Sequence, residues 1–138
     1  MKNEIKLSIL SDKKNISIIR NIIGCILIDY NPTVSFINEI KTVLSEAVTN
    51  CIVQAYESMP DKWIDINIGI SIEKVSLEVI DKGIGIENVD LAKEALYSTK
   101  KDEERSGLGF TIMELFCDKL VVESKVNEGT RVYLEKKW

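Results

Sequence analysis

Residues 64–86 read IDINIGISIEKVSLEVIDKGIGI, and this stretch decides the fold class. Apolar residues alternate with polar residues or glycine over residues 64–70 and again over residues 75–80, which predicts two strands that each bury one face. A short turn around Glu73-Lys74 joins the strands into a hairpin, so an antiparallel or mixed sheet is expected. The second strand runs directly into Asp81-Lys82-Gly83-Ile84-Gly85, where two glycines let the backbone turn sharply.

The residues before this hairpin predict one strand and two helices. Polar and apolar residues alternate over Glu4–Ile9, which predicts a strand with one solvated face. Isoleucines at helical spacing follow, with Asn15 or Ser17 as the expected helix cap. Asn31-Pro32-Thr33 interrupts the chain, and a long amphipathic helix is expected from Val34 to Tyr56.

The residues after the hairpin predict two further helices and a second hairpin. The expected elements are a short helix over Val89–Leu96, a loop over Ser98–Ser106, a helix over Phe110–Cys117 opened by Gly107-Leu108-Gly109, and strands at residues 120–122 and 132–134 around the turn Asn127-Glu128-Gly129. Helices that cover one face of a mixed, mostly antiparallel sheet would make a two-layer α/β sandwich.

Length and composition bound the class of protein. The chain has 138 residues, which fits a single domain over residues 1–138. Lys and Arg total 18 and Asp and Glu total 22, so the net charge of −4 argues against a nucleic-acid-binding protein. The sequence contains no histidine, which excludes imidazole-based catalysis and histidine-ligated zinc.

The cysteines and the hydropathy pattern indicate a compartment. Cys25, Cys51 and Cys117 are odd in number and stand in apolar surroundings, which is typical of buried, reduced thiols in an intracellular protein. The N-terminal residues lack the apolar core of a signal peptide, and the longest apolar stretch, Ile22–Ile28, is too short to span a bilayer. We therefore expect a cytoplasmic protein that does not associate with membranes.

Two glycine motifs are candidates for ligand contact. The carboxylate of Asp81, beside Gly83 and Gly85, could accept a hydrogen bond from an amine such as that of adenine, although a simple tight turn would have the same sequence. Gly107-Leu108-Gly109 at a helix N-terminus could bind phosphate through free backbone N–H groups, aided by basic residues of the preceding loop. The alternative for this second motif is a flexible loop with ordinary surface charges.

A third candidate lies on the long helix. Glu46, Asn50 and Gln54 are spaced four residues apart and share one side of it. The amide oxygen of Asn50 suits Mg²⁺ when nucleotide phosphates supply the other ligands, and the carboxylate of Glu46 could accept a proton from an attacking hydroxyl. The alternative is a solvated polar edge of an amphipathic helix.

The order and spacing of these motifs resemble the Bergerat ATP-binding fold, the superfamily of gyrase, heat-shock protein 90, histidine kinases and mismatch-repair ATPases. Residues 40–50 look like the N-box of the anti-sigma factor serine kinases of sporulating bacteria. Residues 98–100 and 104–114 look like the short ATP lid and second glycine box of that family. The similarity covers nearly the whole chain.

The resemblance implies a role for each motif residue. Asn50 would bind Mg²⁺ at the phosphates of ATP or ADP, and Glu46 would be the general base for a protein serine. Asp81 would accept the adenine amine. The remaining expected nucleotide contacts are Gly83 and Gly85 at the adenine pocket, Thr130 beside it, Gly107, Leu108 and Gly109 around the phosphates, and Lys100 and Arg105 in the lid.

The resemblance also implies partners. An ATP-bound homodimer would hold a sigma factor of RNA polymerase and would phosphorylate an anti-anti-sigma factor on serine. Arg20, a lone cation on an apolar helix, is a candidate partner contact, with a solvated helix edge as the alternative. The first strand and helix are candidates for the dimer interface, though they could equally belong to the core. Gln54 departs from the family, where histidine is frequent, and Asn127-Glu128-Gly129-Thr130 lacks a basic residue before the glycine.

Two rival functions remain open on the sequence. The first is a nucleotide-gated protein that binds a sigma factor with little or no kinase activity. The second is a detached histidine kinase domain, which the missing phospho-acceptor histidine and the short lid disfavour.

Overall fold

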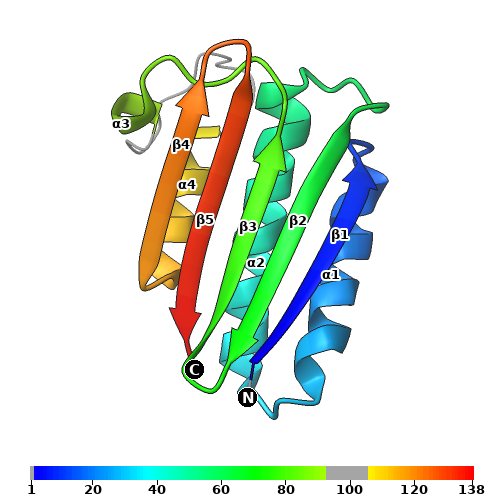
Figure 1. Ribbon diagram of the computed structural model, residues 1–138, viewed down its shortest axis with the longest axis vertical. Coiled ribbons are helices and arrows are strands. Elements are labelled where there is room, and N and C mark those ends of the chain that lie inside the picture. The colour runs from blue at the N-terminus through cyan, green and yellow to red at the C-terminus, as the bar shows by residue number, and fades with distance from the viewer. Residues whose placement is uncertain (1, 93–105) are drawn as a thin grey trace.

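The computed structural model describes residues 2–92 and 106–138 (Figure 1). The elements in chain order are β1 (Lys2–Leu10), α1 (Lys14–Ile28), α2 (Val34–Asn50), η1 (Cys51–Ala55), β2 (Trp63–Ser71), β3 (Lys74–Asp81), α3 (Val89–Ala92), α4 (Ser106–Phe116), β4 (Lys119–Lys125) and β5 (Gly129–Lys137). No helix in these ranges has the length and apolarity needed to cross a membrane.

The strands form one five-stranded sheet in the order β1-β2-β3-β5-β4. Both predicted hairpins, β2–β3 and β4–β5, are confirmed. Every pairing in the described sheet is antiparallel, so the expected sheet is confirmed without any parallel component. The pairing of β3 with β5 joins the two hairpins and places Asp81 opposite Thr130.

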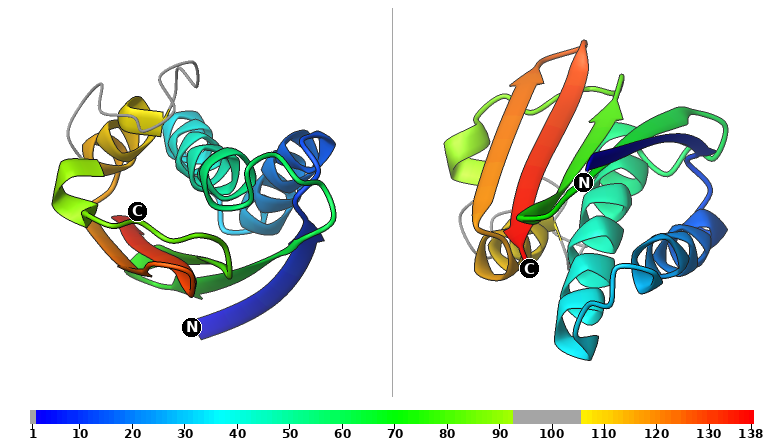
Figure 2. Two further views of the ribbon diagram at one scale, coloured as in Figure 1. Left: turned by 90° about the horizontal axis from the view of Figure 1, so that it is seen from above. Right: turned by 60° about the horizontal axis from the view of Figure 1, so that its bottom comes forward.

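Helices α1, α2 and α4 cover one face of the sheet, as Figure 2 shows from above, which confirms the two-layer sandwich. The inward-facing residues of β2 are Ile64, Ile66, Ile68 and Ile70, and all four are almost fully buried. Each such side chain contributes about 1.5–3 kcal/mol through burial. The alternation that predicted the strands is therefore the alternation that builds the core.

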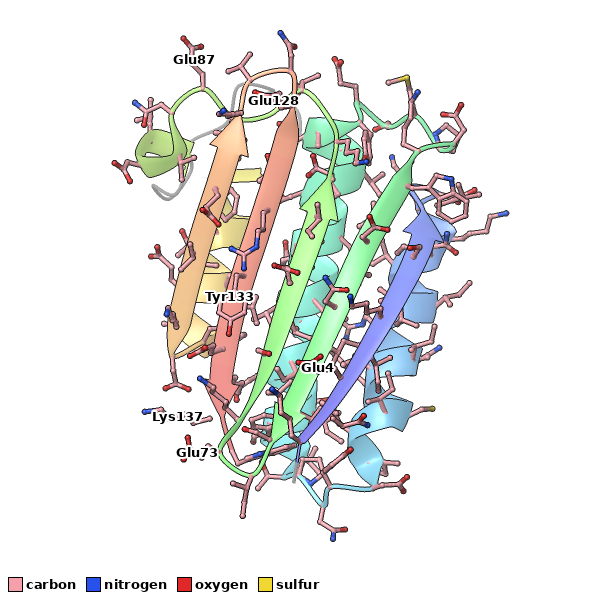
Figure 3. The ribbon with its side chains drawn as sticks, in the orientation of Figure 1. Glu4, Glu73, Glu87, Glu128, Tyr133 and Lys137 are labelled. Carbon is pink, nitrogen blue, oxygen red and sulfur yellow. The ribbon has the colours of Figure 1, made fainter. Side chains whose placement is uncertain are left out.

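The other face of the sheet carries polar side chains, and no helix within residues 2–92 and 106–138 covers it (Figure 3). Arg131 on β5 lies between Glu78 on β3 and Glu123 on β4 and forms an ion pair with each. The Cζ atom of Arg131 lies over the ring of Tyr133, which is labelled in Figure 3, at 5.2 Å from the ring centroid. These contacts satisfy the charges of a solvated sheet face.

The starts of α1 and α2 differ in how well the sequence predicted them. Neither Asn15 nor Ser17 caps α1, because the helix already begins at Lys14, whose backbone N–H donates to the Asp12 carboxylate at 3.0 Å. Thr33 caps α2 by accepting from the backbone N–H of Phe36 at 3.0 Å. The tight turn after β1 starts the helix before the predicted caps, because the backbone N–H of Asn15 already donates to the carbonyl of Asp12 at 2.9 Å.

The end of the long helix is a π-helix rather than the expected α-helix. In η1 the backbone N–H of Tyr56 donates to the carbonyl of Cys51 at 2.9 Å, five residues back. The carbonyl of Ala55 accepts from the backbone N–H of Ile84 at 3.1 Å. The wide turn is therefore docked on the glycine turn that follows β3, a tertiary contact that helical periodicity does not reveal.

The C-terminal elements match the expected order with shifted bounds. The described part of the short helix is Val89–Ala92, and the rest of its expected range lies outside the described residues, as does the expected loop apart from Ser106. Helix α4 begins at Ser106, four residues before the expected Phe110, because its first turn incorporates the three-residue glycine motif. Strand β5 extends well beyond residues 132–134, since it pairs along both edges.

The cysteine prediction is partly wrong. Cys51 is buried and Cys117 is partly buried, but Cys25 is exposed on α1. Burial raises the pKa of the Cys117 thiol to about 11. An amphipathic helix exposes one side, and Cys25 lies on it.

Candidate functional site

Four segments that are distant in sequence meet at one end of the molecule, the upper end in Figure 1. They are the end of α2 with η1, the end of β3, the start of β5 and the start of α4. Glu87 and Glu128 mark the same end in Figure 3. The motif residues of the sequence lie on these segments.

Asp81 is the last residue of β3 and is only 5% exposed. Its Oδ1 accepts from the backbone N–H of Gly83 at 3.0 Å and from the backbone N–H of Thr130 at 3.2 Å. Both backbone donors fall on Oδ1, which fixes the orientation of the carboxylate. This arrangement suits the acceptance of a hydrogen bond from a ligand amine.

The environment of Asp81 perturbs its ionisation. Burial raises the pKa of Asp81, while the N–H groups of Gly83 and Thr130 and the thiol of Cys51 act in the opposite direction. Burial and the neighbouring Asp81 charge raise the pKa of Cys51 well above its usual value. Cys51 is therefore a protonated thiol beside a carboxylate, which makes it a poor nucleophile.

Both glycines after Asp81 are required by close backbone approach. A Cβ at Gly83 would lie 2.4 Å from the carbonyl oxygen of Ala55. Gly85 has φ of +76°, and a Cβ there would lie 2.2 Å from the carbonyl oxygen of Lys125. The predicted sharp turn is confirmed, and it packs against both η1 and the β4–β5 turn.

Thr130 lies beside this turn and has a partner that sequence reasoning missed. The hydroxyl oxygens of Ser124 and Thr130 are 2.7 Å apart, and Ser124 Oγ also accepts from the backbone N–H of Ile86 at 2.7 Å. Ser124 is the register partner of Thr130 across β4 and β5. Correct pairing of that hairpin is the one signal that would have found it.

Glu46, Asn50 and Gly109 form the second half of the site. Glu46 is on α2 and is only 3% exposed, which is rare for a carboxylate and inconsistent with a solvated helix edge. A Cβ on Gly109 would lie 3.3 Å from both Glu46 Oε2 and Asn50 Nδ2. Gly109 of α4 therefore lies directly against the Glu-Asn pair, and a larger side chain at this position would fill the space between them.

Two buried amide nitrogens of the long helix have no hydrogen-bond partner among the described residues. Asn50 Nδ2 and Gln54 Nε2 are inaccessible to solvent and make no hydrogen bond within the described part of the chain. An unsatisfied buried donor costs about 1–3 kcal/mol, so such groups are usually completed by a ligand or water. The donor and acceptor set, with the free N–H groups at the start of α4, fits a nucleotide whose phosphates hold Mg²⁺ together with the amide oxygen of Asn50.

Some predicted residues do not lie at this site or lie outside the described residues. Lys100 and Arg105 fall outside them, while Gly107 and Leu108 are in the first turn of α4. Arg20 lies on the seam between α1 and α2, where its Nη1 donates to Ser45 Oγ at 3.0 Å. Its role as a partner contact stays a prediction.

Comparison with known proteins identifies relatives over nearly the whole chain. Residues 9–136 match the histidine kinase-like ATPase domain family. Anti-sigma F factors of Priestia megaterium and Geobacillus thermodenitrificans are 47% and 46% identical to this chain, each over 99% of it and 93% of the relative. The anti-sigma F factor of Clostridium beijerinckii is 40% identical over 99% of this chain and 95% of its own length.

A solved structure supports the fold alone. The histidine kinase domain of the blue-light activated histidine kinase EL346 from Erythrobacter litoralis superposes with a TM-score of 0.53 and 21% identity. The match covers 73% of this chain and 44% of that one. Its α/β arrangement agrees with the Bergerat fold expected from the motifs.

Proposed function

This chain belongs to the anti-sigma F factor family of histidine kinase-like ATPase domains, and from that premise we propose that it is an ATP-dependent serine protein kinase that binds and inhibits a sporulation sigma factor. Residues 1–138 would form the single catalytic domain, acting in the cytoplasm. The kinase substrate would be an anti-anti-sigma factor, phosphorylated on serine. In its unphosphorylated form this partner would displace the sigma factor.

The observation that carries the proposal is the approach of Gly109 to Glu46 and Asn50. It brings the N-terminus of an eleven-residue helix, with its free N–H groups, onto a buried carboxylate and a buried amide. Phosphoryl transfer depends mainly on positioning and on stabilisation of charge, and these are the groups it requires.

Each residue then has a role at the phosphate end. The amide oxygen of Asn50 would hold Mg²⁺, which neutralises phosphate charge when bound. Glu46 would accept the proton of the serine hydroxyl, since a carboxylate held in a buried position is a suitable general base. The backbone of Gly107, Leu108 and Gly109 would bind the phosphates, and Lys100 and Arg105 would contact them from the lid.

Asp81 would recognise the adenine base of the nucleotide. Its carboxylate would accept the adenine amine, while Gly83 and Gly85, which pack against the carbonyls of Ala55 and Lys125, would shape the turn beside the base. Thr130 would support this contact through its N–H bond to Asp81 and its link to Ser124. ATP and ADP forms would favour different partners, so the nucleotide would be both substrate and switch.

Dimerisation is proposed through β1 and α1. Strand β1 is at one edge of the sheet, and α1 exposes Ile18 and Cys25. An unpaired strand edge beside apolar side chains is a common site of self-association. Arg20 on α1, which donates to Ser45 of α2, would contact the protein partners.

Transfer of labelled γ-phosphate from Mg-ATP to a purified anti-anti-sigma factor tests this function. We expect phosphoserine with the unaltered chain, and a loss of at least about 100-fold in Glu46→Gln with nucleotide binding retained. Glu128→Gln is the matched control, because Glu128 is exposed at the same end of the molecule.

Two results would change the conclusion. Nucleotide binding without transfer would favour the nucleotide-gated sigma-binding protein. Absence of nucleotide binding would contradict the whole interpretation of the site.

A further inference from the structure

We propose that the hydroxyl of Tyr56 positions the turn that follows Asp81, which would contact adenine. The preference of the site for adenine over other bases then depends on the end of the long helix, where Tyr56 lies. This inference rests on the proposed function, in which Asp81 accepts the adenine amine. Tyr56 is assigned a role although it is not among the residues proposed to contact the phosphates or the adenine.

Tyr56 is buried and its hydroxyl makes two hydrogen bonds across the fold. It accepts from the backbone N–H of Lys82 at 2.7 Å and donates to the carbonyl of Trp63 at 2.6 Å. Lys82 is the residue between Asp81 and Gly83, whose N–H orients the Asp81 carboxylate. The hydroxyl therefore holds the middle of the segment that aims this carboxylate.

The neighbouring residue of the helix holds the same turn at a second point. The carbonyl of Ala55 accepts from the backbone N–H of Ile84 at 3.1 Å, and Gly83 packs against that carbonyl. Two consecutive residues of the helix end therefore bind two alternate backbone N–H groups of the turn. The π-helical turn of η1 is the local geometry in which both contacts form.

This arrangement links the two ends of the nucleotide site. The helix that carries Glu46 and Asn50 continues directly into η1 and Tyr56. The segment that orients Asp81 is thus attached to the same helix as the groups at the phosphates. A shift at the helix end would move the acceptor for the base relative to those groups.

Removing the hydroxyl isolates this effect. Tyr56→Phe leaves the ring in place but deprives the Lys82 N–H and the Trp63 carbonyl of their partner. We expect the affinity for ADP to fall about 5- to 10-fold, as for the loss of a buried hydrogen bond that orients a ligand group. The loss should depend on the base, because inosine diphosphate carries a carbonyl oxygen where ADP carries the amine and cannot donate to Asp81.

The experiment is calorimetric titration of the full chain with ADP and with inosine diphosphate, each with Mg²⁺. The unaltered chain should prefer ADP, and Tyr56→Phe should reduce that preference at least about 3-fold. Tyr30→Phe is the matched control, since its hydroxyl contacts only Asn3, at 3.4 Å, among the described residues. Urea unfolding of each variant verifies that it is folded at the titration temperature.

Three results would overturn the inference. Equal weakening of both nucleotides would mean that Tyr56 supports the fold without aiming the acceptor. Unchanged ADP binding would mean that the hydroxyl is dispensable. Equal affinity of the unaltered chain for the two nucleotides would mean that Asp81 does not read the amine, whereas failure of the unaltered chain to bind either nucleotide would contradict the proposed function itself.

Discussion

Asp81→Asn should separate the stability of this protein from its nucleotide binding. The substitution keeps the shape of the side chain and changes one oxygen into an NH₂ group. The N–H groups of Gly83 and Thr130 both donate to Oδ1, so the amide oxygen will take that position. Turning the amide around would lose two hydrogen bonds of about 1 kcal/mol each and set donors against donors.

The amide orientation decides the effect on binding. With its oxygen held by two backbone N–H groups, the new NH₂ group faces the ligand. In the proposed site the adenine amine would then meet a donor in place of a charged acceptor. Loss of a hydrogen bond to a charged group, together with an unpaired donor, costs about 3 kcal/mol, which is roughly a 150-fold loss of affinity for ADP.

The effect on stability has the opposite sign. Burial raises the folded-state pKa of Asp81 above its ordinary value of 3.8, so the folded protein holds the proton more tightly than the unfolded chain does. The ionised carboxylate therefore reduces stability as the pH rises through the folded pKa, and this loss is fully present near pH 7. An uncharged amide avoids it, and we expect Asp81→Asn to unfold at an equal or higher urea concentration.

Calorimetric titration with ADP and urea unfolding at pH 7 measure the two effects. Acidification provides a second check on the unaltered chain, because protonation of Asp81 should weaken ADP binding at a pH above the range of an ordinary aspartate. Retained ADP affinity in Asp81→Asn, or a large decrease in its stability, would refute this account of the carboxylate.

Three further predictions concern packing and reactivity. Gly129→Ala should lower the free energy of unfolding by about 2–4 kcal/mol, measured by thermal unfolding. The φ angle of Gly129 is +120°, and a Cβ there would lie 2.1 Å from the carbonyl oxygen of Asp81. A smaller loss would mean that the turn relaxes. Lys136→Met should lower the free energy of unfolding in urea by about 1–3 kcal/mol. The side chain of Lys136 is largely buried, pairs with Glu39 at 3.3 Å and donates to the carbonyl of Phe116 at the end of α4. Unchanged stability would contradict a role for these contacts. Alkylation of Cys117, followed by mass spectrometry, should be slow at pH 8 and accelerate up to about pH 11, where its raised pKa lies, and fast labelling at pH 8 would contradict the burial of this thiol.

The local elements of the fold were largely predictable, and the exceptions have physical causes. Apolar and polar residues alternate visibly over residues 64–80, so these strands can be predicted from the sequence. The start of α2 is also local, because the Thr33 side chain accepts from the backbone N–H of Phe36, three residues later. The π-helical turn at Cys51–Ala55 was not predictable, because it depends on contacts with residues about thirty positions later. The start of α4 was missed since glycine disfavours a helix by propensity, and here tertiary packing overrides that preference.

The sequence by itself determined which residue types this protein has for chemistry and the local geometry of each motif. Glycines at positions 83 and 85 allow a sharp turn, and four-residue spacing puts Glu46 and Asn50 on one side of a helix. Apart from the family resemblance, only the tertiary structure shows that these motifs meet at one end of the molecule. The Thr130 N–H reaches Asp81 across 49 residues because β5 pairs with β3, and Gly109 lies against Glu46 and Asn50 because α4 packs on α2. Strand order and helix docking are fixed by burial summed over the whole core, a quantity that no local pattern contains.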